Sequence, residues 1–335
     1  MIVNTDPFKR FIEIWLYVML LLIILIVAVG GLTRLTDSGL SITEWELFKG
    51  IFPPINNKMW MFYFELYQQI PEYKEINYNI SLAEFKFIYY WEYGHRLLAR
   101  LIGLTSILPL IYLFFRFKNF RKNLLKYYII FLLICFQGFI GWFMVKSGLI
   151  DNTDVSHYRL ALHLGVAFII LSLIFWYVLE NLRIQKFEKR LSKKFLNLFL
   201  FFIIIQIILG AFLAGLNGGL LFNTWPDMNG YFLATDISIK DLYLKESLNN
   251  ASVIQFYHRI IAYLILIFLF ILNFIFFKNN LNFKYLIYLN LAVFLQVILG
   301  IITLVTGVKI FYASIHQLGS ILVLTSFLLI VYKNS

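Results

Sequence analysis

The sequence has very little cysteine and very little charge. Its single cysteine, Cys135, excludes an intrachain disulfide and argues against a metal cluster built on cysteines. Only 14% of the 335 residues are charged and 61% are hydrophobic, whereas soluble globular chains are about half apolar and about a quarter charged. These scarcities exclude an ordinary soluble domain and indicate a polytopic membrane protein.

The net charge of +11 does not indicate a nucleic-acid partner, and we expect none. The lysines and arginines lie mainly in short connections between apolar runs, which is typical of residues that orient a membrane protein. The first apolar run is too long for a signal peptide, and no small-residue cleavage site follows it. It is therefore predicted to be the first membrane span.

Eight apolar runs are long enough to cross the roughly 30 Å hydrocarbon core of a bilayer as helices. The sequence therefore predicts an all-α polytopic membrane protein with eight transmembrane helices. The runs lie near residues 12–33, 88–115, 124–145, 158–180, 195–216, 253–277, 284–306 and 310–332.

The connections between these runs differ in charge. Residues 116–126 and 183–194 are rich in lysine and arginine and lie, by alternation, on the same side as both chain ends. The positive-inside rule places this side, with both termini, in the cytoplasm. The outer side then holds a long segment, residues 34–87, where Ser81 and Glu84 fit a capping box and short helices are expected.

Four stretches of the first half recur in the same order in the second half, which indicates a tandem repeat. Both halves begin on the cytoplasmic side, so the repeat is parallel. We predict two four-helix bundles, residues 1–182 and 183–335. The matched pairs are 31–45 with 211–225 (an offset of 180), 91–104 with 254–267, 137–148 with 296–307, and 158–165 with 312–319.

Four of the five histidines lie at one depth, near the outer ends of four predicted spans: His95, His163, His258 and His316. Each is four to seven residues into its span, which corresponds to about 6–10 Å below the outer surface. An isolated histidine is most often an interior side chain with a hydrogen bond. Four at one depth, two in each repeat, favour ligands instead.

Two imidazoles that face each other across a bundle can bind a haem iron axially. Zinc would need three or four ligands, which two histidines in each half do not supply. Copper stays open as an alternative. Arg96 and Arg259 each follow a histidine, and guanidinium groups suit the propionates of a haem. The alternative for both arginines is ordinary snorkelling toward lipid head groups.

The two halves differ at one position close to the repeated histidines. Glu92 stands three residues before His95, whereas Gln255 stands three residues before His258. Residues three apart share a helix face. Because only the carboxylate can ionise, we place chemistry in the N-terminal half and a permanent electron-transfer haem in the C-terminal half. The alternative for Glu92 is a carboxylate paired with a nearby arginine.

The motifs "GGLTRLTDSGLSITEW", "WEYGHRLLARLIGL", "YRLALHL", "GAFLAGLNGGLLFNTWPDM", "QFYHRIIAY" and "ASIHQLGS" resemble those of the haem A synthase family. The resemblance covers nearly the whole chain. The long first outer segment and the lack of paired outer cysteines resemble the proteobacterial and mitochondrial branch. The family oxidises a methyl group of haem O to a formyl group, through hydroxymethyl and gem-diol stages, to make haem A for terminal oxidases.

The resemblance also implies roles for individual residues. His95 and His163 match the pair near the substrate haem, and His258 and His316 match the pair that ligates a haem b cofactor. Glu92 matches the catalytic acidic residue. A chain of this family is expected in the bacterial cell inner membrane, with its haem sites toward the outer side.

The expected partners are the lipid bilayer, a haem O synthase and an electron donor. The sequence does not decide whether the chain forms a homo-oligomer. The alternative function is a membrane cytochrome b that carries electrons from quinol and does no chemistry on the haem. A transporter is a third class, disfavoured because no broken half-helices occupy corresponding positions of the two halves.

Overall fold

The computed structural model describes residues 7–116, 124–149 and 153–335 of the chain. These parts form helices without any strand, and eight helices are long and apolar enough to cross a membrane, as predicted. Most of the basic connection 116–126 lies outside the described residues. The eight helices are α1 (Pro7–Leu35), α4 (Leu82–Arg116), α5 (Leu125–Gly148), α6 (His157–Asn181), α7 (Lys193–Gly215), α8 (Ala251–Lys278), α9 (Lys284–Val305) and α10 (Ile310–Asn334).

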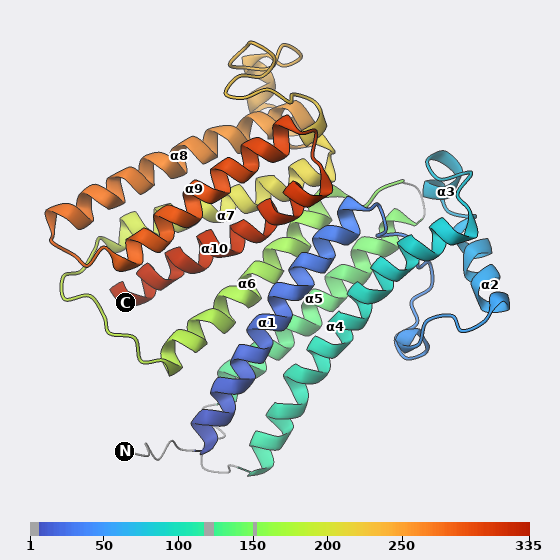
Figure 1. Ribbon diagram of the computed structural model, residues 1–335, viewed down its shortest axis with the longest axis horizontal. Helices are drawn as coiled ribbons and strands as arrows, with labels where there is room; N and C mark the ends of the chain where they lie inside the picture. The colour runs from blue at the N-terminus through green and yellow to red at the C-terminus, as the bar shows by residue number, and fades with distance from the viewer. Residues whose placement is uncertain (1–6, 117–123, 150–152) are drawn as a thin grey trace. The chain divides into compact units, whose positions relative to one another are not determined.

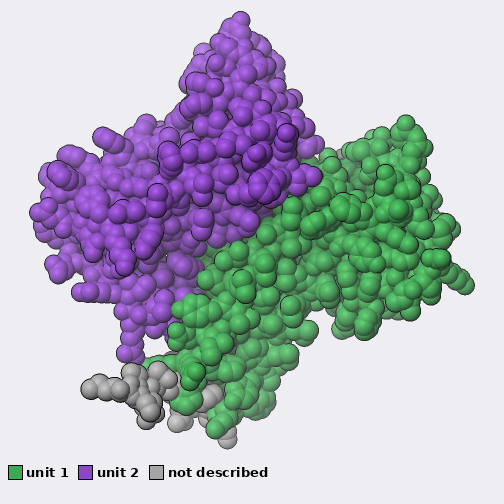
Figure 2. Space-filling view, in the orientation of Figure 1, with its two compact units in different colours: residues 1–159, 169–174 green, residues 160–168, 175–335 purple. Residues whose placement is uncertain are grey.

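The chain divides into two compact units, coloured separately in Figure 2. Unit 1 contains residues 1–159 and 169–174, and unit 2 contains residues 160–168 and 175–335. The residues of α6 are thus shared between the units, whereas the predicted boundary lay after residue 182. The two-bundle division stays a prediction.

In unit 1, α4 packs against α1 and α5 (Figure 1). Trp15 of α1 donates a hydrogen bond from its indole to the Thr105 carbonyl of α4, at 2.7 Å. In unit 2, α7 packs against α8 and α10, and α9 packs against both α8 and α10. Phe199 and Phe327 are fully buried where α7 meets α10, with ring centroids 4.7 Å apart.

The connection between α1 and α4, residues 36–81, folds into the short helices η1 (Lys49–Ile51), α2 (Asn57–Tyr67) and α3 (Pro71–Glu75). Short helices were predicted here, and so was a capping box at Ser81 and Glu84 within this outer segment. The box is present, but the helix that it starts is α4, which begins at Leu82 rather than near residue 88 as predicted. The Ser81 amide donates to Glu84 Oε2 at 2.7 Å, and the Glu84 amide donates to Ser81 Oγ at 3.3 Å. Two donors at the helix start are thereby satisfied.

An aromatic core fastens this connection to the first turns of α4. Trp60 and Phe64 of α2 pack against Phe85 and Tyr89 of α4, and all four side chains are buried. The Trp60 and Tyr89 ring centroids are 5.0 Å apart, in edge-to-face geometry. Aromatic pairs of this kind add to the free energy of burial. The connection is therefore a packed layer with its own core.

A buried carboxyl group lies within this layer. Glu72 is 5% exposed, and its Oε1 accepts hydrogen bonds from the Tyr67 hydroxyl at 2.9 Å and the Asn77 amide at 3.3 Å. Burial is the main cause that raises the pKa of Glu72 from 4.5 to about 8, and the Tyr67 hydrogen bond opposes it. The folded layer therefore holds this carboxyl in its neutral form below about pH 8.

The raised pKa makes the stability of this layer depend on pH. The folded protein keeps the Glu72 proton between pH 4.5 and about 8, whereas the unfolded chain loses it near pH 4.5. The contribution of Glu72 to stability is therefore fully present below pH 4.5 and falls as pH rises to about 8, by up to about 1.4 kcal/mol per pH unit. Hydrogen exchange of residues 57–77 should show this slope, and Glu72→Gln should flatten it. The exposed Glu75→Gln is the control; an unchanged slope in Glu72→Gln would contradict the assignment.

Candidate functional site

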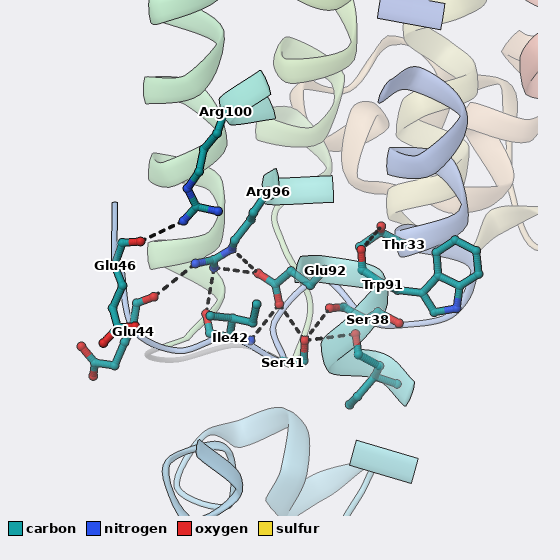
Figure 3. A network of polar contacts seen from close by, with 11 residues as sticks. Thr33, Ser38, Ser41, Ile42, Glu44, Glu46, Trp91, Glu92, Arg96 and Arg100 are labelled. Atoms are coloured by element: carbon teal, nitrogen blue, oxygen red, sulfur yellow. Dashed lines mark hydrogen bonds and ion pairs between the residues drawn. The ribbon is translucent and has the colours of Figure 1, made fainter. Parts of the chain in front are cut away.

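Glu92 lies in the third turn of α4, buried beneath the chain that follows α1. It is 3% exposed. Its Oε2 accepts hydrogen bonds from the Ser41 hydroxyl and the Ile42 amide, both at 2.8 Å. Its Oε1 accepts from Arg96 Nη2 at 2.7 Å and Nε at 3.0 Å (Figure 3). Both carboxylate oxygens are thus engaged, and the alternative of an arginine-paired carboxylate describes the observed contacts.

Arg96 joins this carboxylate to the backbone. Besides the bidentate contact to Glu92, its Nη2 donates to the Ile42 carbonyl at 2.8 Å and its Nη1 donates to the Glu44 carbonyl at 3.2 Å. Guanidinium groups present rigidly spaced donors, so they suit such multiple contacts. Glu92 and Arg96 together bind both the N–H and the C=O of Ile42. We call this set of contacts the N-terminal joint.

Arg100, one turn further along α4, extends the N-terminal joint. Its Nε donates to the Leu47 carbonyl at 3.1 Å, and its Nη2 donates to the Glu46 carbonyl at 2.8 Å. The guanidinium needs the bare backbone of Gly50, where an added Cβ would lie 2.9 Å from Nη2. The two arginines therefore hold four carbonyls of the segment that follows α1 against α4, namely those of Ile42, Glu44, Glu46 and Leu47.

Unit 2 contains a corresponding joint with one change of polarity. Gln255 Nε2 donates to the Phe222 carbonyl at 3.1 Å, and Arg259 Nη2 donates to the same oxygen at 3.0 Å. Phe222 aligns with Ile42 at the repeat offset of 180 residues. In unit 1 Glu92, three residues before the histidine, accepts a hydrogen bond from a backbone N–H. In unit 2 Gln255, at the corresponding position, donates a hydrogen bond to a backbone carbonyl, so this joint carries no buried carboxylate.

The histidines lie against glycines of neighbouring helices. A Cβ added at Gly30 of α1 would lie 3.1 Å from His95 Nε2, and one at Gly210 of α7 would lie 3.4 Å from His258 Cε1. Gly30 and Gly210 are related by the same offset of 180 residues. The repeated glycine could therefore have been found in the sequence, but it lies one residue before the matched stretches 31–45 and 211–225 and was not predicted.

His316 of α10 has the tightest of these contacts, since a Cβ at Gly300 of α9 would lie 2.8 Å from its Cε1. The four predicted ligands, His95, His163, His258 and His316, are all half-buried. Because His95 and His163 belong to different units, their predicted pairing stays a prediction.

The residues of unit 2 fit a bound haem in their donor chemistry. The Nδ1 atoms of His258 and His316 are buried and have no hydrogen-bond partner among the described residues. Gln206 Nε2 lies 3.2 Å from His258 Nε2 and orients that ring. A small cavity with mostly apolar walls lies next to these histidines. Ala262 of α8 and Ser320 of α10, each one turn after the histidine of its helix, line it. Two imidazoles beside an apolar space suit axial ligation of an iron porphyrin.

Replacing the arginine should lower the free energy of unfolding more in the N-terminal joint than in the corresponding joint of unit 2. Arg96→Met leaves the buried Glu92 carboxylate without its charged partner, which costs about 3–5 kcal/mol. The matched control, Arg259→Met, removes hydrogen bonds to carbonyls only and should cost about 1–3 kcal/mol. Thermal unfolding in detergent measures both variants. Equal losses would contradict the account of the N-terminal joint.

Comparison with known proteins identifies the family. Residues 13–328 match the COX15-CtaA family, described as "Cytochrome oxidase assembly protein". The chain is 57% identical over 335 residues, 100% of both chains, to "Heme A synthase" of Pelagibacter ubique. It is 40% identical over 326 residues to "Heme A synthase" of Rickettsia africae, covering 95% of this chain and 96% of that one. It is 41% identical over 319 residues to that of Rickettsia bellii, covering 93% and 94%. The chain therefore belongs to the COX15-CtaA family of cytochrome oxidase assembly proteins.

Proposed function

We propose that this chain is a haem A synthase, which oxidises a methyl group of haem O to a formyl group. The observation that carries the proposal is the identity of 57%, from end to end, with a protein named for that activity. The eight membrane-spanning helices suit a lipophilic substrate made in the membrane. The methyl carbon is hydroxylated twice, and the resulting gem-diol loses water to give the aldehyde.

We assign the chemistry to the N-terminal repeat, residues 1–182, because the joint of unit 1 contains the carboxylate that unit 2 lacks. Loss of a hydrogen atom and then an electron from a methyl group develops positive charge at its carbon, and a fixed negative charge nearby stabilises that cationic intermediate. Ser41, the Ile42 amide and Arg96 hold Glu92 in one position, so little reorganisation accompanies the reaction. His95 and His163 are the proposed contacts to the substrate haem.

We assign a haem b cofactor to unit 2, with His258 and His316 as its axial ligands. When bound, this group supplies one-electron transfer. Gln206 orients the His258 ring, and Gly210 and Gly300 leave room for the imidazoles. Arg259 Nε is buried without a hydrogen-bond partner among the described residues, which supports its proposed role toward a propionate. Arg96 is proposed for the substrate's propionates, alongside its structural contacts.

The remaining assignments follow from charge distribution and family. The bacterial cell inner membrane is the proposed location, with both termini in the cytoplasm and the haem sites toward the outer face. The proposed partners are a haem O synthase, which supplies the lipophilic substrate, and a separate electron donor.

The exchange of carboxylate for amide tests the assignment of chemistry. Glu92→Gln should retain haem but lose haem A, because an amide cannot supply the negative charge. Gln255→Ala is the matched control and should keep activity within a few fold, since Arg259 still binds the Phe222 carbonyl. Haems extracted from membranes that also contain a haem O synthase report the product. Undiminished haem A from Glu92→Gln would refute the role of Glu92, and haem b alone from the unaltered chain would favour the cytochrome b alternative.

The ligands of unit 2 can be tested by spectroscopy without turnover. His258→Ala and His316→Ala should each abolish the haem b spectrum of the purified protein. Gly300→Ala should also abolish the spectrum, since its Cβ would displace the His316 ring. Gly210→Ala should retain haem b, because a Cβ there would make only an ordinary contact with His258. Intact spectra in both histidine variants would contradict the proposed ligation.

A further inference from the structure

Unit 1 contains a cavity of about 240 Å³ beside the N-terminal joint. One wall is the segment that follows α1, with Thr43 and Trp45, and Arg96 of α4 forms a second. The third wall is the last two turns of α5, where Trp142 and Lys146 are joined by apolar side chains. The cavity therefore combines two cations, two indole rings and an apolar lining.

Each cation of the cavity lies over an indole ring. Arg96 Cζ is 5.4 Å from the ring centroid of Trp45, and Lys146 Nζ is 5.1 Å from that of Trp142. Cations attracted to the faces of indole rings are held in place without being neutralised. The cavity thus presents fixed positive charge next to flat apolar surfaces.

The two cations are not equivalent. Arg96 is paired with Glu92 at 2.7 Å and donates to two backbone carbonyls, so its charge is largely compensated. Lys146 has no carboxylate within 4.0 Å in the described part of the chain. Lys146 is therefore the cation of the cavity whose charge no carboxylate of the described chain compensates.

The second repeat lacks these features of α5. The alignment that pairs Gln137 with Gln296 places Ile301 opposite Trp142 and Val305 opposite Lys146. At these two aligned positions, an indole and a lysine are thus present only in the repeat that also carries Glu92.

A carboxylate attached to a flat, apolar ring system matches this cavity, because the ammonium group pairs with the anion and the indoles pack against the ring edge. The haem O of the proposed function has this chemistry, with two propionates on one edge of a tetrapyrrole. We propose that the cavity binds the propionate-bearing edge of the substrate and that Lys146 is the charged partner of a propionate. This inference rests on the proposed function.

The test compares Lys146→Gln with Lys146→Arg, using haem O and its dimethyl ester as the two probes. Loss of one charge-assisted hydrogen bond should raise the KM for haem O, and its dissociation constant in spectral titration, about tenfold. Turnover at saturation should change little. Lys146→Arg should restore binding to within a few fold, and the uncharged ester should bind the unaltered chain and Lys146→Gln equally.

Lys86→Gln is the matched control, because Lys86 Nζ also lies 5.1 Å from an indole centroid, that of Trp60, but does not line the cavity. It should leave the KM unchanged. An unchanged KM and dissociation constant for haem O in Lys146→Gln would overturn the inference. It would also be overturned if Lys146→Gln weakened binding of the dimethyl ester as much as binding of haem O. If the unaltered chain makes no haem A, the proposed function fails, and the titrations still decide whether Lys146 binds the propionate edge.

Discussion

The ion pair between Glu92 and Arg96 is the contact on which the organisation of unit 1 depends. A buried carboxylate within a membrane-spanning segment is costly unless it is paired and hydrogen-bonded. Here it is paired at 2.7 Å and receives two further hydrogen bonds from the segment after α1. The same contacts therefore bury the charge and attach that segment to α4. The attached segment also forms one wall of the adjacent cavity.

The second unit repeats the joint without the charge, and the comparison separates architecture from chemistry. Arg259 binds the Phe222 carbonyl as Arg96 binds that of Ile42, so an arginine after the histidine serves the fold in both units. Holding the chain in place requires no carboxylate, because Gln255 achieves it with an amide. The carboxylate at Glu92 therefore requires a different explanation, and its proposed catalytic role supplies one.

Much of the fold follows from local patterns in the sequence. Hydropathy predicted all eight helices, because a span of about 20 apolar residues has no other stable form in a bilayer. Ser81 and Glu84 predicted a helix start in the outer segment, because a capping box involves neighbours in the chain. That helix is α4 itself, which begins at Leu82, six residues before the predicted start of the second span. The contacts from Ser41 and Ile42 to Glu92 were not predicted, since they join residues about 50 positions apart and no residue type marks them. For the same reason the engagement of Arg96 and Arg259 with backbone carbonyls was missed, and the burial of Glu72 required knowledge of the layer around it.

A structure of the protein with haem O bound tests the central claim most directly, namely that the unrepeated carboxylate marks the reacting site. The account predicts haem O in the N-terminal repeat, with the methyl group that is oxidised facing Glu92. Haem O bound beside Gln255 in the C-terminal repeat, or bound with that methyl group turned away from Glu92, would contradict it.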